Sequence, residues 1–180
     1  MVLTKSDSDL FYSLWFPMLN YVNKTLKVSE ELGEIDRTKP VNIYAAMEVA
    51  NTLWENIDLI DDYLIEKGDI PEEHRNIIVG WKKHITDEFF IERHLKKGSI
   101  FISSTNEVYL VSGIISSWEE IFWDRTVPIY VKATLIPFKN VIITDGLLQP
   151  YNVVFGHGYK SDLKNIYMSA KTNGTLHKSL

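Results

Sequence analysis

The 180-residue chain contains no cysteine, and this absence excludes disulfide bridges, thiolate metal sites and cysteine nucleophiles. Long apolar runs are also missing, since no stretch approaches the roughly 18 consecutive apolar residues that mark a membrane-spanning helix. The opening residues MVLTKSDSDLFYSLWF lack the basic region and long apolar core of a signal peptide. We therefore expect a cytoplasmic protein that does not enter a membrane, in line with a reducing compartment.

Recognisable enzyme motifs are absent as well. The sequence has no Gly-x-Ser-x-Gly nucleophile motif, no phosphate-binding loop, no His-Glu-x-x-His zinc motif and no internal repeat. Its apolar share of 45% and charged share of 24% are ordinary for a globular protein. A chain of this length can bury a core of its own, so we expect one domain spanning residues 1–180.

Charge is unevenly distributed along the chain. The net charge is −5, but residues 1–98 carry 12 basic and 18 acidic side chains, whereas residues 125–180 carry 7 basic and 2 acidic ones. Between positions 48 and 73, nine acidic residues face a single lysine. Such faces are either solvated exteriors or docking surfaces for a charged protein or a small anion. The acidic overall balance argues against a dedicated nucleic-acid binder.

The first half of the sequence has the apolar spacing of helices. A helix is predicted over about residues 9–26, because its apolar side chains recur every three or four positions. Pro17 lies in its middle and removes one backbone donor, so we expect a kink there or two short helices. The polar residues 28–39 are predicted to form a connector.

Pro40 opens the clearest helical pattern of the sequence. Its apolar residues are spaced alternately by three and four positions, which is the seam of a helix packed along another helix. The seam consists of Ile43, Ala46, Ala50, Leu53, Ile57, Ile60 and Leu64. Alternatively, a break at Asn56 or Asp58 divides this stretch into two helices, and Gly68 is the predicted C-terminal cap.

A further helix is predicted to begin at Pro71, because proline has no backbone N–H to satisfy in the first turn. Its buried stripe is Ile77, Ile78, Trp81, Ile85 and Phe89. The pattern allows this helix to continue to Leu95, before Gly98 stops it.

After Gly98 the apolar period changes from helical to two, which is typical of strands. Strands are predicted over residues 99–103, 107–112, 127–136, 140–144 and 151–155. A helical turn is expected over 116–122, and Asp145-Gly146 is expected to end the fourth strand as a turn. A closing helix is predicted over 159–171.

Helices followed by strands predict an α+β fold and not an alternating parallel one. We expect an N-terminal helical bundle over residues 1–98, packed on a small, mostly antiparallel sheet within residues 99–180. The closing helix completes this second, β-rich half.

Three residues could form a metal site if residues 71–95 were helical. His84, Glu88 and Glu92 would then follow one another along one helix face. The row lacks the order of a zinc protease motif, and no second motif completes four ligands. An exposed helix face explains the same residues, so we assign no metal site and no cofactor.

The stretch 144–164 contains the main candidate site. A predicted strand ends in the sequence Gly-His-Gly, and a helix follows directly. Free backbone amides at a helix start attract anions, and glycine lets a ligand approach closely. The candidate anion-binding residues are Gly156, Gly158, Lys160 and Lys164. A purely structural turn is the alternative, because the pattern is shorter than known dinucleotide and phosphate motifs.

Asp145 and His157 are the candidate catalytic residues of the same stretch. Asp145 could act as a general base if it pointed into a cleft beside His157. The alternative is that the Asp-Gly pair only forms a turn.

Residues 135–158 read LIPFKNVIITDGLLQPYNVVFGHG. The combination of Pro-Phe-Lys, Asp-Gly-Leu-Leu, Pro-Tyr-Asn and Phe-Gly-x-Gly in this run resembles a segment of uncharacterised bacterial proteins, in which a helical region precedes it and a helix follows. The resemblance implies one structural unit, a hairpin that leads into a turn and a helix, and it implies no function. Some such proteins carry a cysteine-rich zinc tail, which this cysteine-free chain cannot have.

The charge asymmetry and the missing catalytic motifs favour a non-enzymatic binding or regulatory module, with a protein or a small anion as partner. The alternative is a small enzyme or anion-binding domain with its site at the 145–164 corner. Contact between residues 125–180 and RNA or DNA is a third hypothesis.

Overall fold

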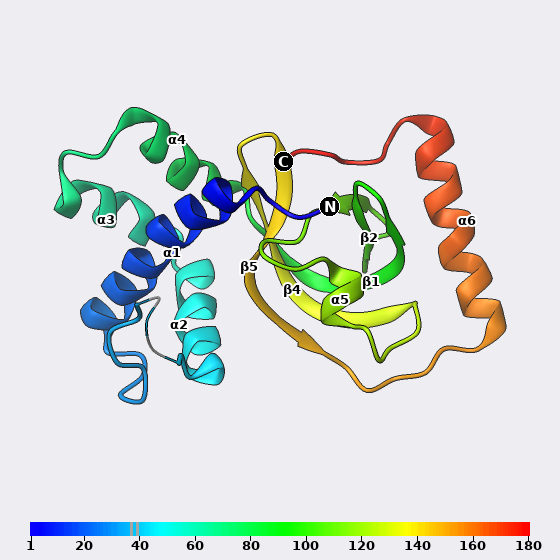
Figure 1. The fold of residues 1–180 in the computed structure, drawn as a ribbon, viewed down its shortest axis with the longest axis horizontal. Coiled ribbons are helices and arrows are strands. Elements are labelled where there is room, and N and C mark those ends of the chain that lie inside the picture. The colour runs from blue at the N-terminus through cyan, green and yellow to red at the C-terminus, as the bar shows by residue number, and fades with distance from the viewer. Residues whose placement is uncertain (37, 39) are drawn as a thin grey trace. The chain divides into compact units, whose positions relative to one another are not determined.

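The computed structural model spans the 180 residues and describes all of them except residues 37 and 39, which fall in the predicted connector. The chain forms two compact units, Ser6–Lys82 and the combination of Met1–Lys5 with Lys83–Leu180. We call them the helical unit and the sheet unit (Figure 1). The α+β class is confirmed, with helices first, then a mostly antiparallel sheet and a closing helix. Among the described residues, no helix has the length and apolarity needed to span a membrane.

The described residues of the helical unit form four α-helices and a terminal 3-10 turn. They are α1 (Lys5–Leu26), α2 (Ile43–Glu55), α3 (Leu59–Lys67), α4 (Glu72–Gly80) and η1 (Trp81–Lys83). Pro17 lies inside α1, which is one helix and is not divided into two. The predicted break after α2 is confirmed, because the backbone N–H of Asn56 bonds to carbonyls of the last helical turn.

Buried aromatic rings form the centre of the helical unit. The Trp15 ring stacks on Trp54 with centroids 5.4 Å apart and meets Trp81 edge-on at 5.5 Å. The predicted seam is buried at five of its seven positions, whereas Ile43 is exposed and Ile57 is half-buried. The alternation of three and four therefore located the packed face correctly.

Two asparagines of α1 hold the segment that follows this helix. Asn20 exchanges two hydrogen bonds with the backbone of Ile35, at 2.8 and 3.0 Å. Asn23 accepts from the N–H of Ser29 and donates to the carbonyls of Ser29 and Leu32. These bonds satisfy backbone groups that have no secondary-structure partner.

The predicted helix does not continue to Leu95, and this prediction is wrong. After α4 and η1 the chain forms strand β1 (Ile85–Leu95), so the helical half ends well before residue 98. β1 pairs antiparallel with two other strands and buries Phe89 and Ile91 completely. These non-local contacts override a local apolar spacing that happens to continue the helical period.

The sheet is a closed five-stranded barrel. The other strands are β2 (Gly98–Ser103), β3 (Val108–Val111), β4 (Ile129–Phe138) and β5 (Val141–Pro150), and their order is β1-β2-β3-β5-β4. All neighbouring pairs are antiparallel except β3 and β5. This order, with a short helix between the third and fourth strands, is the topology of the OB-fold, a Greek-key barrel.

Alternating side chains fill the barrel interior. Phe89, Phe101 and Tyr109 point inward, together with one face of β4. That face is Ile129, Val131, Ala133 and Leu135, which alternate along the strand. Helix α5 (Trp118–Ile121) adds Trp118, whose ring meets Phe101 at 5.3 Å.

The start of α5 is fixed by a capping box. The Ser117 side chain accepts from the N–H of Glu120, and the Glu120 carboxylate accepts from the N–H of Ser117. This reciprocal pair satisfies two donors that a helix start leaves open. The helical turn that the sequence predicted over residues 116–122 is thereby confirmed.

Helix α6 (His157–Asn173) covers the outer face of β2 and β3 (Figure 1). Its apolar stripe packs on outward-pointing residues of these strands, and the cluster consists of Ile100, Ile102, Val108, Leu163, Tyr167 and Ala170. The Arg93 guanidinium lies 4.5 Å from the centre of the Tyr167 ring. Both faces of β2 are covered as a result, and all its residues are buried.

β5 continues through Asp145-Gly146, so the prediction that this pair ends the strand is wrong. The register of β4 and β5 shifts between Ala133 and Leu135, which marks a bulge at this point of β5. Gly146 has φ +85°, a conformation that favours glycine and that suits a bulge. The strand predicted over residues 151–155 is also absent, and this segment has no regular structure.

Two tryptophans five positions apart test the barrel core. Trp118 is 3% exposed, whereas Trp123 is 83% exposed. We expect Trp118→Ala to lower the free energy of unfolding by about 3–5 kcal/mol, because it removes a large buried ring. Trp123→Ala, the matched control, should change it by less than about 0.5 kcal/mol. Urea denaturation followed by circular dichroism measures both, and equal losses would contradict the assignment of Trp118 to the core.

Candidate functional site

Asp145 is part of the buried sheet. Its side chain lies in the β5 bulge, is 3% exposed, and accepts a hydrogen bond from the N–H of Leu147 at 3.0 Å. This contact gives the carboxylate a structural role in shaping the bulge. A general base must reach a substrate proton, and a carboxylate this deeply buried has little access to one.

The four predicted anion-binding residues and His157 are exposed at the start of α6. Gly156 is the N-terminal cap residue, no side chain caps the helix, and the first turn has no acidic residue. The corner thus keeps the open backbone amides that anion binding needs. Asp145 does not share this exposed environment.

His84, Glu88 and Glu92 do not follow one another along a helix face, because residues 85–95 form a strand. Glu88 and Glu92 belong to β1, where a bulge lies between Ile91 and Arg93, and Glu92 pairs with the guanidinium of Arg93. Among the residues that the structure describes, no three His, Asp or Glu side chains are grouped to hold a metal ion.

Glu88 organises a polar centre on the outer face of β1 and β4. Its carboxylate accepts hydrogen bonds from the phenol of Tyr130 and, at 2.7 Å, from the phenol of Tyr151. These two bonds lower the pKa of Glu88. They favour the neutral phenols in return, and the pKa of Tyr130 rises to about 12, mainly because of its bond to Glu88.

Aromatic rings extend from this centre to the start of α6. Phe90 stacks on Tyr130 with centroids 4.6 Å apart, and it meets Phe155 at 5.4 Å and Tyr159 at 5.3 Å. Phe155 also stacks on Tyr159 at 5.1 Å. These contacts dock the irregular segment after β5 on the barrel and fix where α6 begins.

A groove of about 300 Å³ lies beside this aromatic cluster. One wall is the loop between α5 and β4, and the other is the segment that follows β5. The lining residues are Asp124, Arg125, Thr126, Pro128, Ile129, Tyr151, Asn152, Val153 and Val154. We call this feature the 124–154 groove.

Exposed apolar side chains border the 124–154 groove. Trp123 precedes its first lining residue and is 83% exposed, and Val153 and Val154 on the opposite wall are 50% and 93% exposed. A scattered exposed apolar residue needs no explanation, whereas exposed apolar side chains on the wall of a groove are a feature that binding sites share.

Arg125 connects the two walls of the groove. Its Nη1 donates to the carbonyl of Tyr151 at 3.2 Å, while the phenol of Tyr151 is held by Glu88. A guanidinium carries five N–H donors, so most of them stay available for a ligand. The groove is therefore held in shape before a ligand arrives, and it presents a positive charge.

His94 and Ser99 form a side-chain hydrogen bond, with Nδ1 2.8 Å from the hydroxyl. The two residues are direct cross-strand partners of β1 and β2, so the register alone brings them together. Burial lowers the pKa of His94, and nearby Glu119 offsets this only in part. Ser99 is 3% exposed, and both residues line a pocket of about 320 Å³ together with Ser117 and Glu119.

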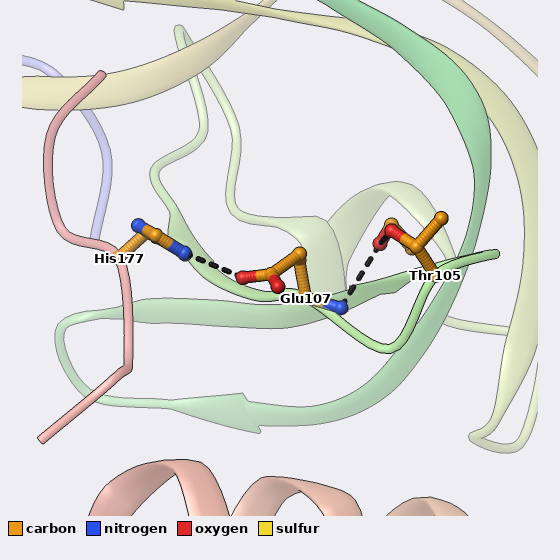
Figure 2. Close-up of polar contacts among 4 residues, drawn as sticks. Thr105, Glu107 and His177 are labelled. Atoms are coloured by element: carbon orange, nitrogen blue, oxygen red, sulfur yellow. Dashed lines mark hydrogen bonds and ion pairs between the residues drawn. The ribbon is translucent and has the colours of Figure 1, made fainter. Parts of the chain in front are cut away.

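A second histidine contact fixes the C-terminal residues (Figure 2). The Nε2 of His177 donates to the Glu107 carboxylate over 2.8 Å, and the His177 ring stacks on Tyr109 at 5.0 Å. Glu107 in turn donates its N–H to the hydroxyl of Ser103. The backbone of His177 also bonds to β3, so this cluster fastens the end of the chain to the barrel.

Comparisons with protein-family models, with curated proteins and with solved structures find no match to this chain. Evidence on function therefore comes from the residues of the chain itself. A topology shared with the OB-fold carries no function by itself, because function depends on sites placed on a fold.

Sequence reasoning missed the 124–154 groove. Its two walls are about 25 residues apart in the sequence, and the antiparallel pairing of β4 with β5 brings them together. One local signal was present, since Trp123 stands among charged residues just after a predicted helical turn. The hydrogen bonds of Glu88 to two tyrosines could not be predicted, because residues 85–95 were expected to be helical.

Glu88 makes stability depend on pH. Its pKa is lowered in the folded chain, so its stabilising effect is complete above the pKa of an unfolded glutamate, about 4.3, and is lost as the pH falls through the folded value. We expect Glu88→Gln to lower the melting temperature at pH 7 and to lower it less at pH 3. Glu66→Gln, at an exposed position of α3, is the control. A difference from wild type that is independent of pH would count against this role of Glu88.

Proposed function

We propose that the chain is a non-enzymatic binding or regulatory module whose sheet unit binds a partner protein at the 124–154 groove. The observation that carries the proposal is a groove that contains Arg125, with the exposed Trp123 directly before its first lining residue in the sequence. Tryptophan and arginine are the residues that most often dominate binding energy at protein interfaces.

The alternative of a small enzyme has less support. Asp145, the candidate base, is buried in the sheet, and the contact between His94 and Ser99 is explained by strand register. The open groove holds Arg125 and Asp124 but no histidine or serine. Its composition suits recognition better than proton transfer.

One face of the barrel is covered by α6, which favours the groove as the binding site. OB-type barrels bind oligonucleotides and oligosaccharides on the face of their second and third strands. In this chain α6 packs on that face and buries Ile100, Ile102 and Val108. The exposed side chains that could contact a partner lie elsewhere, around the groove.

A cytoplasmic location and a bacterial origin belong to the same proposal. The first is supported by the absence of cysteine, since extracytoplasmic proteins often carry disulfides. The second is supported only by the resemblance of residues 135–158 to bacterial sequences.

Peptide selection tests the proposed function. A phage library of random heptapeptides is panned on the full chain, and the enriched peptides are synthesised and titrated by calorimetry. We expect Trp123→Ala to weaken binding about thirtyfold or more, because loss of a central tryptophan costs about 2 kcal/mol or more.

The control for this selection is Met168→Ala, which removes an exposed apolar side chain of α6 and should leave affinity unchanged. Melting temperatures of both variants establish that they fold. No enriched peptide family, or peptides that bind the Trp123 variant as well as the wild type, would refute the proposed function.

A further inference from the structure

Residues 151–156 connect β5 to α6 and are anchored at two aromatic residues (Figure 1). Tyr151 is held by three hydrogen bonds, since its N–H donates to the carbonyl of Tyr130, its phenol to Glu88, and its carbonyl accepts from Arg125. Phe155 is held by the rings that surround it. The ends of this segment are therefore fixed.

The middle of the segment is open on both sides. Successive side chains of an extended chain point in opposite directions. Because the adjacent residues Val153 and Val154 are both exposed, neither side of the segment is covered there. Within the part of the chain that the structure describes, residues 152–155 make no backbone–backbone hydrogen bond. Their donors and acceptors are available to another chain.

We infer that the partner presents an extended, acidic peptide segment that adds to residues 152–155 as a β-strand and seats an apolar side chain against Trp123. The inference rests on the function proposed above and names its partner class. An open backbone bordered by apolar side chains is a template for strand addition, in which main-chain bonds give affinity and side-chain contacts give specificity.

Charge selects an acidic strand. Arg125 lies in the groove at one end of the segment, and α6 begins directly at its other end, with Lys160 exposed in the first turn. Free amides at the helix start add partial positive charge. Residues 125–180 carry 7 basic and 2 acidic side chains in all. A carboxylate on the partner strand is thus favoured at either end.

Two other occupants fit less well. A second copy that paired through its own residues 152–155 would bring Asn, Val, Val and Phe, and no carboxylate for Arg125. A nucleic-acid strand would need several basic side chains along its backbone, but Arg125 is the single basic residue among those that line this groove. An acidic peptide satisfies the apolar, the backbone and the charged features together.

Synthetic peptides test the inference directly. The probe is acetyl-Asp-Val-Glu-Val-Asp-Val-amide, with one control in which lysine replaces each acidic residue and another in which alternate backbone nitrogens are methylated. We expect the first peptide to bind the full chain at low salt and to slow amide hydrogen exchange at residues 152–155 in NMR spectra. The lysine peptide and the methylated peptide should bind at least tenfold more weakly.

A charge-matched pair of protein variants locates the carboxylate contact. Arg125→Glu should weaken binding of the acidic peptide at least tenfold. Lys171→Glu, at the far end of α6, changes the net charge equally and should weaken it by less than twofold. Equal losses in the two variants would show that only the overall charge matters, and would overturn the inference.

The remaining outcomes also decide between partners. Strand addition is overturned if the methylated peptide binds as tightly as the unmethylated one, or if binding leaves the amides of residues 152–155 unprotected. In either case, phage peptides that depend on Trp123 would still support the proposed function. Protection of these amides that grows with protein concentration in the absence of peptide assigns the segment to a second copy. Tight binding of a fluorescein-labelled oligothymidylate that displaces the peptide assigns it to nucleic acid. If neither the phage library nor the probe binds, both proposals fail.

Discussion

The pairing of β1 with both β2 and β4 closes the barrel, and the other features of the sheet unit depend on this closure. A closed sheet has no free edges along its main strands, and its inner face must be filled by side chains. Phe89, Phe101 and Trp118 fill it here. The same closure turns the alternate residues of β1 and β4 outward, which places Glu88 beside the phenol of Tyr130.

The outward face of the barrel is used in two different ways. α6 covers β2 and β3 with an apolar contact, and the aromatic cluster around Glu88 docks the segment that leads into α6. Between these two contacts, residues 152–154 have no backbone hydrogen-bond partner among the described residues. These residues are exposed, so water can satisfy their backbone groups until another strand pairs with them. This unpaired backbone distinguishes the 124–154 groove from the polar clusters of the chain.

Residues that looked suggestive in the sequence have separate structural roles. Asp145 shapes a bulge, and His94 pairs with Ser99 across a hairpin. Lys160 and Gly156 remain exposed at the start of α6, next to the open segment. A carboxylate of a bound strand is therefore one anion that could reach the anion-binding corner that the sequence predicts.

The sequence alone determined the features that depend on local periodicity and capping. It located the helical seam, the α5 turn and the closing helix, because neighbouring residues produce these signals. Tertiary structure decided β1, the bulge at Asp145-Gly146 and the groove. A strand takes its stability from partners far away in the chain, so the apolar run around Phe89 could be assigned to a strand only once β2 and β4 were beside it.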